Sequence, residues 1–193
     1  MPEAVVALTG ASGAQYCVRL IEALVEHKWS VNLIVTSAGA INLDLECGIT
    51  PGELADREGV TLEENANLAA RAASGSARFD AYVICPASGT TIGKIASGIS
   101  DNLATRSALV AMKERRKLII VPREAPYSTP HLKAMFNLSE WGAVILPASP
   151  GFYHSPKNIG DLVDFVVARI LDQLDIDHSL GRRWTGEEVD SED

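Results

Sequence analysis

The sequence predicts an α/β sandwich built on a mainly parallel sheet. Short apolar runs alternate with longer segments of helical periodicity along most of the 193 residues, and this alternation is typical of parallel sheets. Several apolar runs pass directly into turns rich in Gly, Ser or Pro. The length and a hydrophobic content of 47% fit one domain with a sizeable core. We therefore expect a single domain over residues 1–185 and an acidic, disordered tail over residues 186–193.

Five apolar runs are predicted to be strands, because they are short and rich in β-branched or aliphatic residues. The predicted strands are Ala4 to Thr9, Ser30 to Val35, Ala81 to Cys85, Leu118 to Val121 and Ala143 to Leu146.

The segments between these strands carry apolar residues at helical spacing, or follow a capping residue, and are predicted to be helices. The predicted helices are Gln15 to His27, Ala38 to Glu46, Ile92 to Ile99, Leu103 to Arg115, His131 to Glu140 and Ile159 to Leu174. The pattern is weakest between Thr50 and Arg78. There Pro51-Gly52 indicates a turn, and Leu62 to Ala73 is predicted to be helical.

Charge and composition exclude several functional classes. A formal net charge of -8 argues against a general nucleic-acid surface. The acidic start at Met1-Pro2-Glu3 predicts no signal peptide, and no apolar run approaches the length of a membrane span, so we expect a cytoplasmic protein without membrane contact. The three cysteines are isolated, without the spacing of metal ligands, so no metal site is predicted.

Two small-residue turns follow predicted strands. Gly10-Ala11-Ser12-Gly13 is either a phosphate-binding turn or a tight structural turn, and it lacks the third glycine of the dinucleotide fingerprint. In the second turn, Ser88 to Thr91, the hydroxyls either cap the next helix or bind phosphate oxygens. Two such turns at one edge of the sheet favour a mononucleotide.

Arg123-Glu124 lies between two prolines directly after a predicted strand. Its guanidinium is able to clamp a phosphate with two hydrogen bonds, and the neighbouring carboxylate is able to orient that group or shuttle a proton. The alternative is an ordinary salt-bridged loop.

Four further polar residues have unusual settings. Arg106 and Lys113 are seven positions apart and share a helix face, which is either solvated or functional. Tyr153 lies in a loop between prolines, and Arg169 lies in an apolar helix. Arg169 needs an anionic partner, either a protein carboxylate or a ligand.

Taken together, these motifs resemble the flavin prenyltransferases, the UbiX/Pad1-type proteins once described as aromatic acid decarboxylases. The resemblance extends from Val5 to Trp184. The matching motifs are Gly10-Ala11-Ser12-Gly13, Glu46, Cys85-Pro86-Ala87-Ser88, Lys113-Glu114-Arg115-Arg116, Pro122-Arg123-Glu124-Ala125-Pro126 and Pro150-Gly151-Phe152-Tyr153.

The resemblance implies a flavodoxin-like (Rossmann-like) three-layer sandwich that binds FMN and assembles into a dodecamer, with sites formed between subunits. It implies transfer of a dimethylallyl group from dimethylallyl phosphate to N5 and C6 of reduced FMN, which makes the cofactor of UbiD-type decarboxylases. It implies no metal. The sequence agrees, since it lacks an aspartate-rich metal motif.

Roles follow from the resemblance position by position. The implied FMN contacts are Gly10, Ala11, Ser12, Ser37, Ser88, Gly89, Thr90, Thr91 and Arg123. Tyr153, Arg169 and Lys113 are expected to hold the dimethylallyl phosphate, with Arg106 nearby. The remaining catalytic candidates are Glu46 and Glu124 for proton handling, Ser12, and Trp184, which is expected to pack against the prenyl group or the flavin.

Two other functions fit the same fold. FMN-dependent cysteine decarboxylases typically carry Pro-Ala-Ser-Ala-Asn-Thr where this chain has Pro86-Ala87-Ser88-Gly89-Thr90-Thr91, so the missing asparagine argues against that reaction. The other alternative is a non-enzymatic flavin carrier. The intact set of candidate acids, cations and the phenol argues against a loss of activity.

Overall fold

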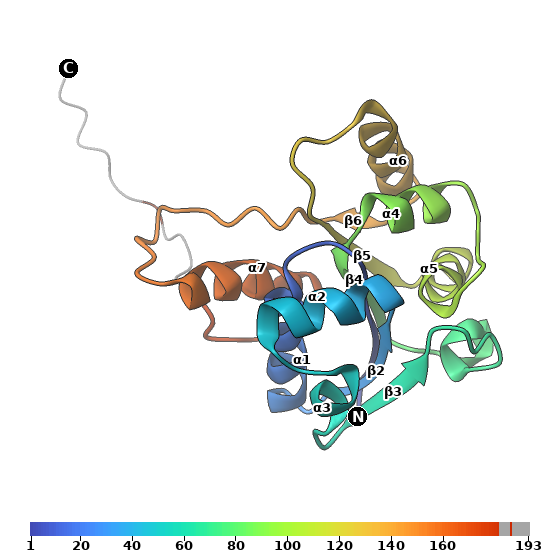
Figure 1. Ribbon diagram of the computed structural model, residues 1–193, viewed down its shortest axis with the longest axis horizontal. Coiled ribbons are helices and arrows are strands. Elements are labelled where there is room, and N and C mark those ends of the chain that lie inside the picture. The colour runs from blue at the N-terminus through green and yellow to red at the C-terminus, as the bar shows by residue number, and fades with distance from the viewer. Residues whose placement is uncertain (182–185, 187–193) are drawn as a thin grey trace.

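The protein is built on one six-stranded sheet in which every neighbouring pair of strands is parallel (Figure 1). The computed structural model describes residues 1–181 and Gly186. The strand order is β3-β2-β1-β4-β5-β6. The strands are β1 (Glu3–Leu8), β2 (Ser30–Val35), β3 (Val60–Glu64), β4 (Ala81–Ala87), β5 (Lys117–Pro122) and β6 (Val144–Ile145).

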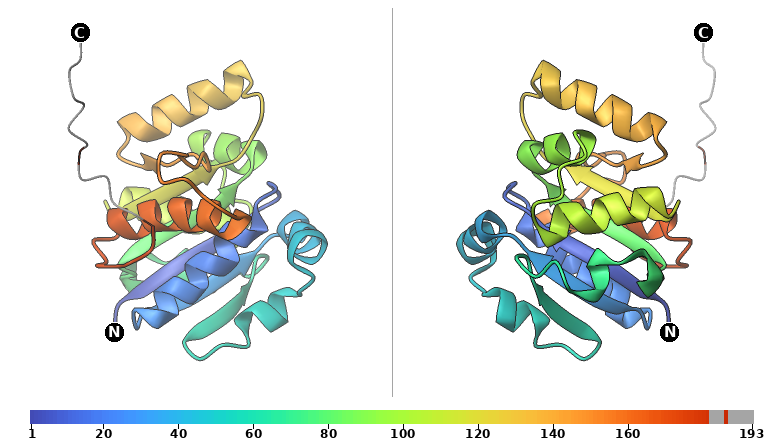
Figure 2. Two further views of the ribbon diagram at one scale, coloured as in Figure 1. Left: turned by 90° about the vertical axis from the view of Figure 1, so that its left-hand side faces the viewer. Right: turned by 90° about the vertical axis from the view of Figure 1, so that its right-hand side faces the viewer.

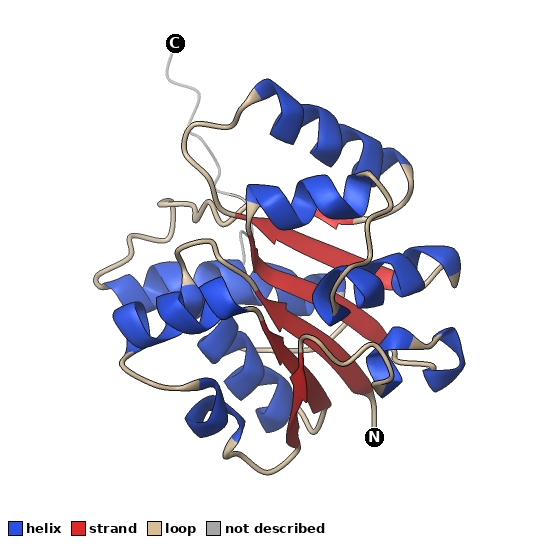
Figure 3. Ribbon diagram, turned by 45° about the vertical axis from the view of Figure 1, so that its right-hand side comes forward, coloured by secondary structure: helices blue, strands red, loops and turns tan. Residues whose placement is uncertain are grey.

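Helices cover both faces of this sheet, which confirms the predicted three-layer α/β sandwich (Figure 3). α1 and α7 pack on one face and α4, α5 and α6 on the other, and the two side views in Figure 2 show these faces in turn. The helices are α1 (Ala14–Glu26), α2 (Ser37–Cys47), α3 (Pro51–Ala55), α4 (Gly89–Ala96), α5 (Leu103–Lys113), α6 (Thr129–Glu140) and α7 (Ile159–Gln173), with short 3-10 turns at Arg71–Ala73 and Gly75–Ala77.

The sequence pattern of the central strands follows from this burial on two faces. In β1, Val6 and Leu8 belong to the core under α1 and α7, whereas Val5 and Ala7 belong to the core under α5. All four residues have no exposed surface. A strand covered on both faces reads as a continuous apolar run rather than as an alternating one.

The prediction of a helix over Leu62 to Ala73 is wrong. Val60–Glu64 forms the edge strand β3 and pairs with β2, and a 3-10 turn follows at Arg71–Ala73. The segment is rich in good helix formers, but pairing with the free edge of β2 outweighs local preference. Asn65, directly after β3, accepts hydrogen bonds from the amides of Leu103 and Ala104 and thereby ties this segment to the start of α5.

Two smaller predictions also differ from the structure. Pro51-Gly52 is not a turn but the start of α3, where Thr50 and Glu53 form a capping box. The helix predicted over Ile92 to Ile99 begins at Gly89, because the Ser88 hydroxyl caps it, and it ends at Ala96.

The strand order places a topological switch point between β1 and β4. From β1 the chain builds the sheet outward to β2 and β3, and from β4 it builds in the other direction to β5 and β6. Ligands of open α/β sheets bind at such a point, beside the carboxyl ends of the strands. Among the described residues, no helix is both long and apolar enough to cross a bilayer.

Candidate active site

Thr9 ties the carboxyl ends of β1 and β4 together. The Thr9 hydroxyl donates to the carbonyl oxygen of Pro86 at 2.8 Å, and the amide of Ser88 donates to the same hydroxyl oxygen at 2.8 Å. Thr9 is completely buried, so these bonds fix the spacing of the two turns that follow the strands. Sequence reasoning missed this residue, although a threonine that closes an apolar strand is a usable signal.

The first turn binds a carboxylate of its own chain. Gly13 has a φ of 113°, a left-handed conformation that favours glycine, and α1 begins directly after it. The amides of Gly13 and Ala14 both donate to Oε2 of Glu46, at 2.8 Å and 2.7 Å. The positive end of α1 is therefore occupied by Glu46, which comes from α2.

These bonds also hold Glu46 in its ionised form. Partial burial alone would raise the pKa of Glu46, but hydrogen bonds from the Ser12 side chain and the two amides, together with the charge of Arg123, lower it below its usual range. The Nε of Arg123 donates to the backbone carbonyl of Ser12 at 3.1 Å. Ser12, Glu46 and Arg123, from three separate loops or helices, therefore form one cluster at the switch point.

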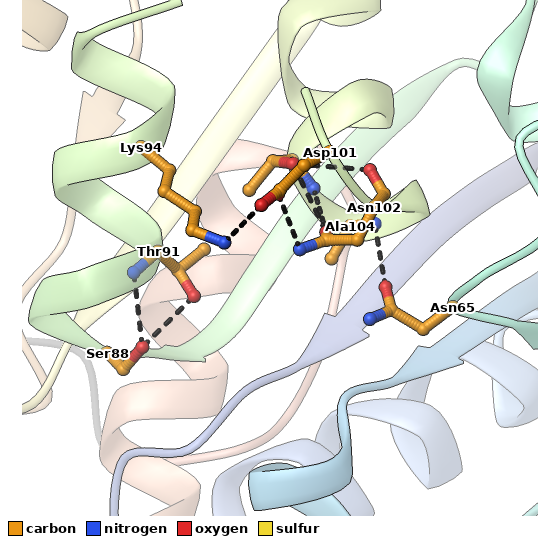
Figure 4. Close-up of polar contacts among 8 residues, drawn as sticks. Asn65, Ser88, Thr91, Lys94, Asp101, Asn102 and Ala104 are labelled. Carbon is orange, nitrogen blue, oxygen red and sulfur yellow. Dashed lines mark hydrogen bonds and ion pairs between the residues drawn. The ribbon is translucent and has the colours of Figure 1, made fainter. Parts of the chain in front are cut away.

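The second turn is a helix cap. The hydroxyl oxygen of Ser88 accepts a hydrogen bond from the amide of Thr91 at 3.2 Å and lies 3.0 Å from the Thr91 hydroxyl (Figure 4). Thr90 is exposed beside them. One turn further along α4, Lys94 pairs with Asp101 at 2.6 Å (Figure 4). Of the two roles predicted for this turn, the structure shows the capping of α4. The turn also presents hydroxyls and backbone amides at the start of that helix.

His131 is a second residue near this turn that sequence reasoning missed. A Cβ atom at position 89 would lie 2.2 Å from its Nε2, so the imidazole occupies the space that Gly89 leaves. The Nδ1 of His131 is buried and has no hydrogen-bond partner among the described residues. His131 on α6 therefore fills the space beside the start of α4.

Ser37 and Glu124 lie at the same edge of the sheet but are not bonded into the cluster. Ser37 is the exposed first residue of α2, which the Thr36 hydroxyl caps. A Cβ atom on Gly10 would lie 2.6 Å from the Cβ of Ala38, so a glycine lets the first turn approach the start of α2. Glu124 is exposed and accepts a hydrogen bond from the amide of Ala125 at 3.2 Å.

Tyr153 and Arg169 are connected through α7. The Tyr153 ring packs edge to face against Phe165, with 5.8 Å between ring centroids. Phe165 and Arg169 are one helical turn apart and share a face of α7. Arg169 is exposed, and its Nη1 pairs with Asp172 at 2.7 Å. Within one chain its anionic partner is therefore a protein carboxylate.

Arg106 and Lys113 lie on α5 and away from the cluster. The Nε of Arg106 donates to the carbonyl of Ala73 at 3.3 Å. Lys113 is the last residue of α5, close to the amino end of β5, and pairs with the adjacent Glu114. Lys113 is thus near the opposite edge of the sheet from Ser12, and α5 and α7 cover opposite faces. One chain by itself does not bring Lys113 together with Arg169 or Arg123.

Two of the predictions concern residues that the structure does not describe, and a third concerns metal binding. Trp184 and nearly all of the tail over 186–193 lie outside the described residues. Within residues 1–181 and Gly186 there is no group of three or more His, Cys, Asp or Glu side chains that would hold a metal ion.

Comparison with known sequences places the chain in a family. The profile of the Flavoprotein family matches residues 2–171. The flavin prenyltransferase UbiX of Pseudomonas aeruginosa is 44% identical over 191 residues, covering 92% of this chain and 91% of the relative. The UbiX of Methanocaldococcus jannaschii is 44% identical over 180 residues, covering 93% and 97%.

Solved structures agree with the sequence relatives. AnUbiX (PadA1), in complex with FMN and dimethylallyl pyrophosphate, has a TM-score of 0.92 and 36% identity and covers 97% of this chain and 99% of its own. A dodecameric FMN-dependent UbiX-like decarboxylase from Escherichia coli O157:H7 has a TM-score of 0.91 and 38% identity, covering 95% and 100%. The peptidyl-cysteine decarboxylase EpiD, at 19% identity and a TM-score of 0.58, shares the fold alone. The chain therefore belongs to the UbiX flavin prenyltransferases of the Flavoprotein family.

Proposed function

We propose that this chain transfers a dimethylallyl group from dimethylallyl phosphate to N5 and C6 of reduced FMN, without a metal ion. Its product would be the prenylated FMN that UbiD-type decarboxylases use as cofactor. The observation that carries the proposal is the cluster of Ser12, Glu46 and Arg123 at the β1–β4 switch point, beside the capped start of α4. The names of the relatives and the FMN and dimethylallyl pyrophosphate bound by AnUbiX support the reaction.

The FMN phosphate belongs at the second turn rather than the first. At the first turn the amides of Gly13 and Ala14 are already bonded to the carboxylate of Glu46, which would repel a phosphate. At the second turn, the start of α4 offers hydroxyls and backbone amides, and the hydrogen bonds of this cap involve no carboxylate. Ser88, Gly89, Thr90 and Thr91 would hold the phosphate.

The remaining FMN contacts would come from the rest of this edge. Gly10, Ala11 and Ser12 follow β1, Ser37 follows β2 and Arg123 follows β5. The close approach of Gly10 to Ala38 brings the first turn and the start of α2 together, and Arg123 is already bonded to Ser12. The donor set of hydroxyls, amides and one guanidinium suits a polar, anionic mononucleotide.

Bound reduced FMN supplies the nucleophilic N5 and C6. The allylic C–O bond of dimethylallyl phosphate breaks with its electron pair leaving on the phosphate, so cations and a phenol at that phosphate lower the barrier. Arg169, Tyr153, Lys113 and Arg106 would take this role. Bonding of the allylic carbon to N5 releases the N5 proton, and ring closure onto C6 would use the prenyl C=C bond, which takes up one proton while C6 gives one up. Glu46 is suited to accept and return protons here because its hydrogen bonds keep it ionised. Glu124 is the second candidate for proton transfer, and Trp184, outside the described residues, is the candidate to pack against the prenyl group or the flavin.

We further propose that complete sites form between subunits, in a dodecamer like that of the Escherichia coli neighbour. The proposed phosphate ligands on α5 and α7 lie on opposite faces of one sheet, so different copies must supply them to one leaving group. Large apolar side chains on several surface elements support such assembly. Among them, Ile41, Leu45, Phe136, Phe152 and Ile159 are each at least 60% exposed.

The reaction is tested by anaerobic incubation of the purified protein with reduced FMN and either dimethylallyl phosphate or the diphosphate. Mass spectrometry of the released flavin then reports the product. A gain of one prenyl unit with either donor is expected, and the comparison identifies the preferred donor. Flavin that binds but stays unmodified with both donors would contradict the proposal and favour a flavin carrier.

The position of the phosphate is tested by a matched pair of capping variants. Ser88 caps α4 and Ser128 caps α6 in the same way. Ser88→Ala and Ser128→Ala are each expected to lower the unfolding free energy by about 1 kcal/mol. Only Ser88→Ala should also weaken FMN binding, measured by fluorescence titration. Equal FMN affinity in both variants would rule out the second turn as the phosphate site.

A further inference from the structure

The guanidinium of Arg169 is the outer end of a hydrogen-bonded chain that runs into the protein. Its Nη1 lies 2.7 Å from Oδ2 of Asp172, and Oδ1 of Asp172 lies 3.1 Å from Nε2 of His178. The exposed fraction of the side chain falls along this chain, from 53% for Arg169 to 17% for Asp172 and 2% for His178.

This geometry fixes the orientation of the guanidinium more firmly than a surface ion pair would. Exposed pairs are mobile and contribute little to stability. Here both oxygens of the carboxylate have partners, and the inner partner is an almost fully buried ring. One bond to Asp172 uses one of the five N–H donors of the arginine, so the planar group is oriented while most donors remain able to bind an oxyanion.

Arg169 lies between Asp172 and the residue that contacts Tyr153 along α7. Phe165 lies one turn before Arg169 on α7 and packs against the Tyr153 ring. Asp172 lies on the other side of Arg169 along the helix, at the end of α7. Asp172 thus contacts the arginine from the end of α7 that is farther from the Tyr153–Phe165 contact.

We propose that Asp172 is a positioning residue for Arg169 and that His178 holds Asp172 in place. Together they set the guanidinium toward the phosphate of the prenyl donor before that donor binds. This inference rests on the proposed function, in which Arg169 and Tyr153 bind dimethylallyl phosphate. Neither Asp172 nor His178 touches the donor, and both act through the arginine.

The test compares Asp172→Ala, which removes the acceptor, with Asp172→Asn, which keeps an amide oxygen in its place. Binding of dimethylallyl phosphate is measured by calorimetry on protein loaded with oxidised FMN, which does not turn over. We expect Asp172→Ala to raise the dissociation constant about tenfold and Asp172→Asn to recover most of the affinity. The KM for dimethylallyl phosphate should rise in parallel, with a smaller change in kcat and unchanged FMN affinity.

Three further variants separate the orientation of Arg169 from effects of charge and folding. Asp175→Asn removes a carboxylate three residues away that pairs with Lys117 rather than with Arg169, and it should leave donor affinity unchanged. His178→Leu removes the inner donor and should weaken donor binding less than Asp172→Ala, whereas His178→Gln, which keeps an N–H donor, should bind normally.

Three outcomes would overturn the inference. Tighter donor binding in Asp172→Ala would mean that the carboxylate only competes with the phosphate. Unchanged binding would mean that Arg169 needs no support, and a joint loss of FMN affinity and melting temperature would mean that Asp172 is structural. If the native protein binds dimethylallyl phosphate but transfers no prenyl group, the proposed function fails while this test still applies; if it does not bind the donor at all, both fail.

Discussion

Glu46 occupies the position at the start of α1 where many α/β proteins bind a ligand anion. Its carboxylate accepts hydrogen bonds from two backbone amides and from the Ser12 hydroxyl, and it lies near the positive charge of Arg123. This internal anion explains why a glycine-rich turn after the first strand need not be the phosphate site. The same interactions make Glu46 a base that is ionised at neutral pH and held within the cluster.

Replacing Glu46 by Gln should change both stability and its pH dependence. The native pKa of Glu46 is lowered, so its contribution to stability is present above the pKa of the unfolded chain and is lost as the pH falls through the native value. We expect Glu46→Gln to lower the unfolding free energy by roughly 1–2 kcal/mol at pH 7. The gap between variant and native protein should begin to narrow as the pH falls below about 4 and close below the native pKa of Glu46.

Urea unfolding at fixed protomer concentration measures this effect. Glu58→Gln is the charge-matched control, because Glu58 is an exposed carboxylate outside the site. If both variants follow the same stability curve against pH, the proposed role of the amide bonds at Glu46 is wrong.

Gly89 is required by a neighbour rather than by its backbone angle. A Cβ atom there would lie 2.2 Å from Nε2 of His131. Gly89→Ala should therefore lower the unfolding free energy by roughly 1–3 kcal/mol, although alanine alone favours a helix. The double variant Gly89→Ala/His131→Ala should recover the loss, as measured by thermal unfolding. A double variant no more stable than Gly89→Ala would show that the imidazole is not the obstacle.

At the scale of elements, most helices and strands form where hydrophobic periodicity predicts them, and β3 shows why one does not. Val60–Glu64 alternates weakly and carries two adjacent glutamates, so nothing local distinguishes it from a helix. It is a strand because β2 presents a free edge and because Asn65 is bonded to the start of α5. Both partners are distant in sequence, so no local pattern reveals them.

Two helical glycines give a matched test of how closely α2 packs on the sheet. At Gly39, in α2, a Cβ atom would lie 2.5 Å from the backbone oxygen of Leu8. At Gly93, in α4, nothing lies within 4 Å. We expect Gly39→Ala to destabilise the protein by roughly 2–3 kcal/mol and Gly93→Ala to stabilise it by roughly 0.5–1 kcal/mol. Chemical denaturation measures both, and equal effects would contradict close packing of α2 on β1.

At the scale of the whole molecule, the proposed catalytic groups divide among three surfaces. Ser12, Glu46 and Arg123 lie at the switch point, Tyr153 and Arg169 lie along α7, and Arg106 and Lys113 lie on α5 across the sheet. The sheet lies between the α7 residues and the α5 residues, so these two groups cannot meet within one chain. In the proposed mechanism, contact between copies would bring them together.

Complementation between inactive subunits tests this arrangement. Arg123→Ala and Lys113→Ala are each expected to abolish prenyl transfer when every subunit carries the change. Coexpressed in equal amounts, they should regain about a quarter of the native activity, because a random mixture pairs an intact Arg123 with an intact Lys113 from another copy at that frequency. Prenylated flavin is the readout, and size-exclusion chromatography checks assembly. No recovery in a properly assembled mixture would place both residues in the same subunit's site or outside any site.

The sequence by itself determined the α/β class, five of the six strands and the two turns at the sheet edge, because burial on two faces and turn chemistry leave local patterns. It also placed Arg123 and Ser12 among the candidates. Only the tertiary structure decided that Glu46 caps α1, that Thr9 joins β1 to β4, and that Arg169 is backed by Asp172 and His178. Apart from the pair of Arg169 and Asp172, which lie three residues apart on α7, these contacts join residues of different elements. Their energy depends on distances that are set only when the strands pair and the helices pack on the sheet.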